Sequence, residues 1–341
     1  MRVAFGEPFD VPVGYLNTAV TGVPPQRVVT AVGEAVAAWS QGRVQPADLE
    51  PAVTAAREGF ARLVGVPGER VAIGASVSSL VAQVVSAVPD GSRVLVAEGE
   101  FTSVTYPFAA QAARGLRLDE VPLAELPGLA AGYDWVAVSV VQSRDGSVVD
   151  LAALRAARER GGVRVLLDVT QAAGWMPLGL AWADAVVGAG YKWLLSPKGA
   201  AWLAVGTEVE AAMVPLTASY YAGSDGARSM YGLPLSLRDD ARRFDASPGW
   251  FAHVGAAQAL PWLASLDLHR VRDHCVGMAN RLRTGLGLPP AESAILAVEA
   301  GDTDRLRRAG VAATSRAGRT RLACHLYTTE EDVAAAIAAL T

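Results

Sequence analysis

Short apolar runs alternate with longer helical patterns through the middle of the chain. Five of the runs predict buried strands, at residues 92–100, 134–142, 163–170, 183–191 and 199–206. Two segments between them, residues 103–115 and 150–162, predict helices that end at glycines. This alternation predicts an α/β fold with a largely parallel sheet that helices cover on both faces. Because ligands of such sheets bind beyond the carboxyl ends of the strands, the residues just after each strand are the candidates for a site.

The last third of the chain has a different pattern. Residues 319–341 predict a strand, a turn and a final helix that is capped near Thr328 or Thr329. Together with the helical pattern of residues 269–287, this predicts a smaller α+β domain. The expected division is an N-terminal segment at 1–20 that packs on the small domain, a large domain at 21–249 and the small domain at 250–341.

One uncharged stretch, Val71–Pro89, is as long as a membrane span. It contains four serines, a glutamine and an early glycine, so we expect a strand that leads into a buried helix and no membrane association.

Composition and charge narrow the class of protein. The chain has 341 residues, is 51% hydrophobic and carries a formal net charge of −4. These values predict a globular protein and argue against nucleic acid as a partner. Two cysteines are too few for a disulfide framework, and the N-terminus lacks the apolar core of a signal peptide. We therefore expect a cytoplasmic location. The four histidines do not have the spacing of a metal site, so no metal is expected.

Lysine is almost absent from the sequence. Of the 30 basic residues only Lys192 and Lys198 are lysines, and the other 28 are arginines. Arginine replaces lysine as a surface charge, but a guanidinium stays protonated and cannot attack a carbonyl. Lys192 is therefore a candidate nucleophile. We expect Lys198 to be a surface residue, with a position near a phosphate as the alternative.

Polar residues follow three of the predicted strands. Asp168 and Gln171 follow one, Tyr191 and Lys192 follow another, and the small residues 74–79 open a helix. Each has an ordinary structural explanation, such as a helix cap or a tight turn. Together these residues suit an aromatic aldehyde that carries a phosphate. The amine can form an imine with the aldehyde, and the carboxylate can keep the ring nitrogen protonated. The helix N-terminus can bind the phosphate. That ligand is pyridoxal 5′-phosphate (PLP).

Residues 166–205 resemble the core of the class V aminotransferase family, which includes cysteine desulfurases, selenocysteine lyases and kynureninases. The family pattern is Asp-x-x-Gln or Asp-x-x-His, a lysine about twenty residues later, then Pro-x-Gly. Here it falls on Asp168, Gln171, Lys192, Pro197 and Gly199. The resemblance extends over nearly the whole chain and implies a PLP-dependent enzyme of fold type I that acts on an amino acid.

The resemblance also implies roles at the cofactor ring. Lys192 resembles the Schiff-base lysine, which also moves the substrate α-proton. Asp168 resembles the partner of the ring nitrogen, and Gln171 resembles the donor to the ring hydroxyl. Phe101 lies where the family stacks an aromatic or histidine side chain on the ring. Tyr191 resembles a tyrosine that contacts the phosphate.

Further residues are expected around the phosphate. Ala75 and Ser76 resemble the residues of the phosphate site at a helix start, and Ser78 is a further candidate there. Ser247 resembles a residue that reaches the phosphate of the neighbouring subunit. The resemblance therefore implies a homodimer with shared active sites.

Arg321 resembles the arginine that binds the substrate carboxylate. Asn17 lies in residues 15–25, which resemble the family's opening segment, and it is the second expected substrate-binding residue. Desulfurases carry a cysteine on the loop before this arginine, but residues 309–320 contain none. We expect Cys324 to be a small buried side chain, which disfavours a desulfurase. The usual Ser-x-His before the lysine is Ala-Gly-Tyr at 189–191, as in kynureninase-like and aminotransferase-like members.

Three functions remain open at this point. The first is an aminotransferase. The second is a lyase that breaks a C–S bond by β-elimination, or a kynureninase-like hydrolase. The third is a regulator that only binds the cofactor. Ser143 and Arg144 lie at a strand end where carbon–sulfur lyases carry a polar pair, or they belong to a solvated loop. The tyrosines of one long loop either line the substrate pocket or only pack: Tyr220, Tyr221 and Tyr231.

Overall fold

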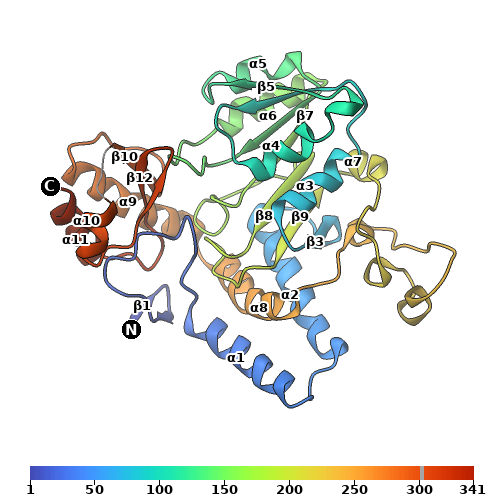
Figure 1. Cartoon of the computed structure of the whole chain (residues 1–341), viewed down its shortest axis with the longest axis horizontal. Helices are drawn as coiled ribbons and strands as arrows, with labels where there is room; N and C mark the ends of the chain where they lie inside the picture. The colour runs from blue at the N-terminus through green and yellow to red at the C-terminus, as the bar shows by residue number, and fades with distance from the viewer. Residues whose placement is uncertain (300–302) are drawn as a thin grey trace.

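The computed structural model describes residues 1–299 and 303–341. Its centre is a seven-stranded sheet in the order β3-β9-β8-β7-β6-β4-β5 (Figure 1). The strands are β3 (Val71–Gly74), β4 (Arg93–Ala97), β5 (Arg117–Val121), β6 (Trp135–Ser139), β7 (Arg164–Asp168), β8 (Ala185–Ala189) and β9 (Ala201–Val205).

All five predicted strands are present, and the sheet is parallel from β5 to β8. Strand β9 runs antiparallel to both of its neighbours, β8 and β3. The apolar pattern did not predict β5, because its sequence Arg-Leu-Asp-Glu-Val is charged and it lies at the edge of the sheet.

Alternate side chains of each strand enter two different cores. Val94 and Val96 of β4 pack in one apolar cluster, whereas Leu95 and Ala97 pack in the other. The first cluster contains side chains of α3 (Val77–Val85) and α4 (Thr102–Ala109). The second contains side chains of α2, α6 and α8, so helices cover both faces as predicted. The bounds of the other large-unit helices are α1 (Gln26–Ser40), α2 (Pro46–Val64), α5 (Leu126–Leu129), α6 (Leu151–Arg160), α7 (Thr207–Ala212) and α8 (Trp250–Ser265).

The helix ends follow local chemistry. Asp150 caps α6, and its carboxylate accepts a hydrogen bond of 2.9 Å from the backbone amide of Ala153. Thr329 and Asp332 form a capping box at the start of α11 (Glu330–Leu340), as the sequence predicted. The stretch that resembled a membrane span forms β3 and α3, and no helix among residues 1–299 and 303–341 is long and apolar enough to cross a membrane.

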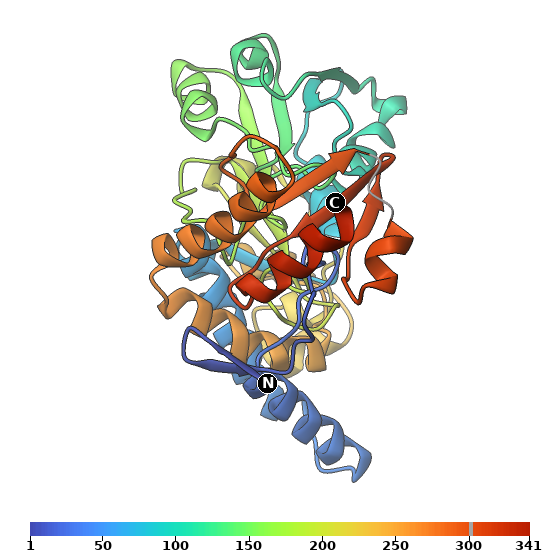
Figure 2. The same cartoon turned by 90° about the vertical axis from the view of Figure 1, so that its left-hand side faces the viewer.

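A second, smaller unit lies to one side of the sheet in Figure 1 and faces the viewer in Figure 2. Its antiparallel sheet has the order β10-β12-β11 and packs with the helices α9 and α11. The elements are α9 (Leu268–Gly285), β10 (Ile295–Glu299), α10 (Thr303–Arg308), β11 (Thr314–Arg316) and β12 (Arg319–Ala323).

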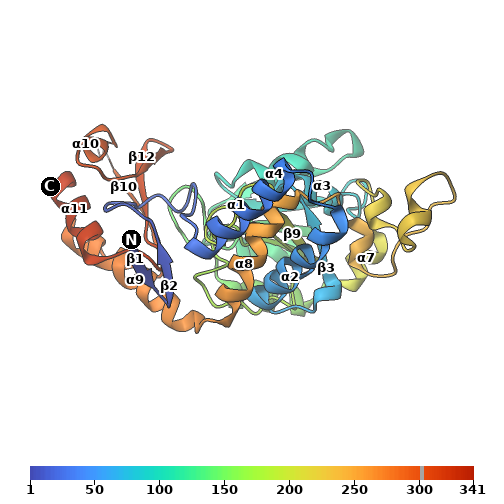
Figure 3. The ribbon, with the colours of Figure 1, turned by 90° about the horizontal axis from the view of Figure 1, so that it is seen from below.

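The N-terminal residues join this unit, with β1 (Arg2–Ala4) and β2 (Glu7–Phe9) beside it (Figure 3). Arg2 pairs with Asp332 of α11, and Leu16 accepts a hydrogen bond of 2.8 Å from the backbone amide of Ala323. Helix α8 packs instead along α2, where a Cβ on Gly59 would lie 2.7 Å from Leu260. The division at residues 20 and 249 stays a prediction.

Candidate active site

Lys192 lies in a tight turn directly after β8. The backbone amide of Ser196 donates to Gly190 O at 3.0 Å, which closes the turn, and the Lys192 side chain is buried. The N-terminal segment crosses directly over this turn, because the amide of Gly22 donates to Tyr191 O at 2.9 Å. A Cβ on Gly22 would lie 2.0 Å from Lys192 O, so only glycine allows this approach.

Two adjoining cavities meet at Lys192. The inner cavity, of about 240 Å³, is lined by Ala75, Ser76, Val77, Phe101, Ser103, Ser139, Ser143, Asp168, Thr170, Gln171, Ala189, Tyr191, Lys192 and Lys198. The outer cavity, of about 490 Å³, is lined by Ala19, Val20, Thr21, Gly22, Pro24, Phe101, Ser143, Tyr191, Lys192, Ser196, Pro197, Lys198, Arg316 and Arg321. The lysine is thus placed where two separate groups can be held on either side of it.

Asp168 ends β7 inside the inner cavity. Its carboxylate accepts a 2.7 Å hydrogen bond from the amide of Thr170, and within the described residues it forms no ion pair. Burial raises the pKa of Asp168 to about 6; the Glu100 charge adds to this rise and the Lys192 charge opposes it. A buried carboxylate without a paired cation is suited to hold a protonated ring nitrogen.

The pKa of Lys192 moves in the opposite direction. Burial lowers it to about 8, against the attraction of Asp168, and the charges of Arg321 and Arg316 lower it further. The Lys192 Nζ atom lies 5.4 Å from the ring centre of Phe101 and 5.5 Å from that of Tyr191. The amine therefore loses its proton more easily than an exposed lysine, as a nucleophile or general base requires.

Gln171 is held by three different segments. Its Nε2 donates to Ala19 O at 3.1 Å and to Ser143 Oγ at 3.2 Å, and its Oε1 accepts from Trp193 Nε1 at 2.7 Å. His325 of the small unit in turn contacts Trp193 O at 3.1 Å through Nε2. This network fixes the amide at the edge of the inner cavity.

The start of α3 lines the inner cavity through Ala75 and Ser76. Ser76 is the N-cap and accepts a 3.3 Å hydrogen bond from the amide of Ser79. Ser78 is exposed and lies outside the lining of both cavities. Ser247 is also exposed and outside both, on the loop before α8.

Arg321 of β12 forms the far wall of the outer cavity. Its side chain is buried, and its Nη1 donates to the backbone oxygen of Ser143 and, at 3.0 Å, to Ser143 Oγ. Burial and the charge of Arg316 lower the pKa of Arg321 to about 10. Within the described residues, neither Nε of Arg321 nor the buried Oδ1 of Asn17 has a hydrogen-bond partner. Asn17 lies outside the lining of both cavities, and its backbone pairs with Ala323.

Two residues of the site, Arg316 and Glu100, were not expected, and Lys198 combines its two expected positions. Its side chain is exposed, as expected for the surface, and it also lines both cavities, with Nζ 5.7 Å from the ring centre of Tyr191. Arg316 of β11 lines the outer cavity, and its position five residues before Arg321 was the only signal in the sequence that could have indicated this. The buried Glu100 accepts 2.8 Å and 2.7 Å hydrogen bonds from the amides of Ser139 and Phe101, which fixes Phe101 at the start of α4.

The structure shows which of the residues with two possible roles line the cavities. Ser143 lines both cavities, whereas Arg144 is half exposed and pairs with Asp145. The three tyrosines Tyr220, Tyr221 and Tyr231 line neither cavity.

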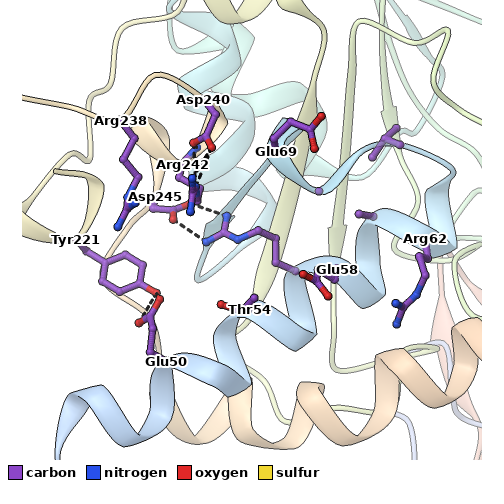
Figure 4. A pocket seen from close by; sticks show the side chains of 14 residues that line it. Glu50, Thr54, Glu58, Arg62, Glu69, Tyr221, Arg238, Asp240, Arg242 and Asp245 are labelled. Atoms are coloured by element: carbon purple, nitrogen blue, oxygen red, sulfur yellow. Dashed lines mark hydrogen bonds and ion pairs between the residues drawn. The ribbon is translucent and has the colours of Figure 1, made fainter. Parts of the chain in front are cut away.

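Tyr221 contributes to a third cavity, which we call the helix cavity. It has about 490 Å³ and lies between α2 and the segment before α8 (Figure 4). In it Arg57 pairs with Asp245, Arg242 pairs with Asp240, and the Tyr221 hydroxyl donates to Glu50 at 2.7 Å. The two buried charges that line it, Arg57 and Asp245, are thus paired with each other.

Comparison with known proteins identifies a family that matches this chain. The family described as aminotransferase class V matches residues 14–306. The uncharacterized aminotransferase YcbU of Bacillus subtilis (strain 168) is 28% identical over 306 residues, which cover 83% of this chain and 81% of that protein. The isopenicillin N epimerase of Streptomyces clavuligerus is 28% identical over 230 residues, 62% of this chain and 56% of the epimerase.

Solved structures share the fold. The cystine C-S lyase C-DES superposes with a TM-score of 0.85 at 19% identity, covering 97% of both chains. The cysteine desulfurase CsdA of Escherichia coli superposes with a TM-score of 0.81 at 21% identity, covering 97% of this chain and 95% of that one. A C-DES mutant in this group has glycine covalently linked to its PLP cofactor.

The buried, unpaired carboxylate of Asp168 and the helix start at Ser76 in the inner cavity fit PLP. The matched family covers most of the chain, and the sheet order and the small C-terminal unit agree with its fold. The chain therefore belongs to the class V aminotransferase family and is a PLP-dependent enzyme of fold type I.

Proposed function

We propose that the enzyme is an aminotransferase that moves the amino group of an amino acid to a 2-oxo acid. The observation that carries this proposal is the position of Lys192 between two cavities: one has a buried carboxylate, and the other has a buried arginine with an unused polar atom. Similarity to an aminotransferase over 83% of the chain supports the same reaction class.

The residues of the inner cavity would hold the cofactor. When bound, PLP supplies an aldehyde that takes up the amino group and a ring that withdraws electrons. Asp168 would face the ring nitrogen, Gln171 the ring hydroxyl and Phe101 the ring face. Ala75, Ser76 and Tyr191 would hold the phosphate, where the helix start offers free N–H groups.

The residues of the outer cavity would hold and deprotonate the substrate. Arg321 would bind the α-carboxylate with its free N–H groups, because Ser143 already fixes one end of the guanidinium. Asn17 lies beyond the lining of this cavity, so we assign it no contact with the substrate. The lowered pKa of about 8 lets the Lys192 amine take the α-proton and return it.

Persulfide chemistry of the desulfurase kind lacks a suitable cysteine. Cys275 and Cys324 are both fully buried, and burial raises the pKa of each thiol. Neither thiol can meet a substrate in the outer cavity, whose lining contains no cysteine. The proposed reaction therefore uses no cysteine nucleophile.

The test is to record the visible absorbance of the PLP-loaded enzyme while single amino acids are added. Bleaching by an amino acid and recovery on addition of a 2-oxo acid is the result expected for transamination. Accumulation of pyruvate with ammonia or a thiol would instead establish elimination, and release of a cleaved side chain would establish hydrolysis. Absence of the absorbance after PLP is supplied would refute the assignment of Lys192.

We also propose a homodimer in a reducing, cytoplasmic compartment. A loop between α7 and α8 projects from the end of the molecule opposite the small unit (Figure 3). It exposes Tyr231 and Leu233 at 88% and 90%, and the exposed Ser247 lies outside its own active site. A second copy that covers the loop would explain both features. Light scattering of the purified protein should give twice the chain mass; the monomer mass would contradict the dimer.

A further inference from the structure

The outer cavity contains more positive charge than an amino acid with one carboxylate requires. Lys192, Lys198, Arg316 and Arg321 line it, and its lining within the described residues contains no aspartate or glutamate. Lys192 is accounted for by the proposed chemistry and Arg321 by the α-carboxylate. Lys198 and Arg316 have no such explanation, and Arg316 is the one that shares the small unit's hairpin with Arg321.

The hairpin of β11 and β12 directs Arg316 toward the same cavity as Arg321. In this antiparallel pair Thr314 is opposite Arg321, and Arg316 is opposite Arg319. Partners across a pair and residues two apart share one face of a hairpin, so all three arginines lie on one face. Like charges directly opposite each other destabilise a hairpin, so the fold alone gives no reason to place arginine at 316.

No carboxylate in the described residues compensates the charge of Arg316. Its side chain is exposed, and its Nη1 donates to Thr314 Oγ1 at 3.3 Å and to Ser315 O at 2.9 Å, both neutral acceptors. Its charge acts on the site, since it lowers the pKa of both Arg321 and Lys192. An anion bound beside Arg316 would relieve this repulsion.

We propose that Arg316 binds a second anionic group of the substrate, so that the enzyme prefers amino acids whose side chain carries a carboxylate or similar anion. This inference rests on the proposed function, since it assigns the substrate class of the same site. The outer cavity, at about 490 Å³, has room for such a substrate. Arginine suits the role because its planar fork matches a carboxylate.

The first test measures binding without turnover. The PLP-loaded, full-length enzyme is titrated with glutarate, a dicarboxylate without an amine, and with butyrate, which has one carboxylate and the same stem. We expect glutarate to bind at least tenfold more tightly than butyrate, and Arg316→Gln to abolish that difference. Arg160→Gln is the matched control, because Arg160 is an exposed arginine at the end of α6.

Equal binding of glutarate and butyrate by the native enzyme would overturn the proposal. So would an equal loss of both ligands in the Arg316→Gln variant, because Arg316 would then serve the shared carboxylate or the hairpin itself. A fall in glutarate binding in the Arg160→Gln variant as large as that in Arg316→Gln would also overturn it, since only overall charge would be at work.

The second test uses matched substrates. We expect Arg316→Gln to lower kcat/KM for glutamate or aspartate about 10- to 100-fold while that for glutamine, asparagine and alanine changes less than about threefold. A neutral amino acid preferred by the native enzyme would overturn the inference and leave the aminotransferase intact. If no amino acid reacts but the preference for glutarate depends on Arg316, the proposed reaction fails and the anion site stands.

Discussion

The outer cavity and the helix cavity have the same volume, about 490 Å³, but the charged side chains that line them differ in sign and in pairing. The helix cavity contains acids and bases together, and its most buried pair, Arg57 with Asp245, is joined by a 2.7 Å contact. Among the described residues, the charged side chains that line the outer cavity are all cations. Burial and the charge of Arg316 lower the pKa of both Lys192 and Arg321, and the charge of Arg321 also lowers that of Lys192.

The difference shows that uncompensated charge, more than size, marks a site built for a ligand. In the helix cavity each buried charge satisfies another, which stabilises the packing of α2 against the segment before α8. In the outer cavity no lining residue among those described carries the opposite charge. The four predictions below test this contrast, from the largest expected effect to the smallest.

Replacement of Lys192 should have the largest effect. Lys192→Ala removes the amine that carries the proton, so we expect kcat to fall by about 10³-fold or more. The measurement is the rate of the amino-acid half-reaction with PLP supplied. Lys198→Ala is the matched control, since it removes the only other lysine of the chain, and its exposed side chain should cost no more than about tenfold. Equal losses in the two variants would contradict the role of Lys192.

Removal of one partner of the buried pair should damage stability. Asp245→Ala leaves Arg57 buried without its carboxylate, and also removes the acceptor of a 2.8 Å hydrogen bond from the amide of Ile73. We expect the free energy of unfolding to fall by about 3–5 kcal/mol, measured by urea denaturation. Asp240→Ala, in the same cavity but partly exposed with Arg242, should cost no more than about 1 kcal/mol. A similar cost for both would contradict the importance of burial.

Asp168 should make the cofactor-free enzyme less stable as the pH rises. Its pKa is about 6 in the folded protein and near 3.8 in a solvated chain, so the folded state holds this proton more tightly. The stability this contributes is complete below pH 3.8 and is lost as the pH rises through 6. Relative to Asp168→Asn, the free energy of unfolding should fall by about 2 kcal/mol between pH 4 and 7. A difference that does not change with pH would show that the carboxyl group is not desolvated.

The smallest effect is expected at Tyr221. Tyr221→Phe removes the hydroxyl that donates to Glu50, a contact at the solvent-exposed edge of the helix cavity. The free energy of unfolding should fall by no more than about 1 kcal/mol, and kcat/KM should stay within about twofold. A large loss of activity would bring the helix cavity into the reaction and end the contrast between the two cavities.

Much of the fold followed from local patterns. The five apolar runs became β4, β6, β7, β8 and β9, and the Asp150 and Thr329 caps formed as predicted. The direction of β9 did not follow, because an apolar run has the same pattern in a parallel and an antiparallel strand. Strand β5 was missed for a related reason: an edge strand buries too little of its surface to need an apolar run.

The sequence and the tertiary structure likewise determined different features of the site. The sequence by itself determined which residues have the required chemistry: a lysine among 28 arginines, and the spacing of Asp168, Gln171 and Lys192 that the family shares. Only the tertiary structure decided that Glu100 fixes Phe101, that Lys198 lines both cavities and that Arg316 meets the same cavity as Lys192. Glu100 joins Phe101 to Ser139 of β6, and the outer cavity has lining residues from both the small unit and the turn after β8. Both arrangements depend on packing between elements that are not adjacent in the sequence, since desolvation and charge act through space and not along the chain.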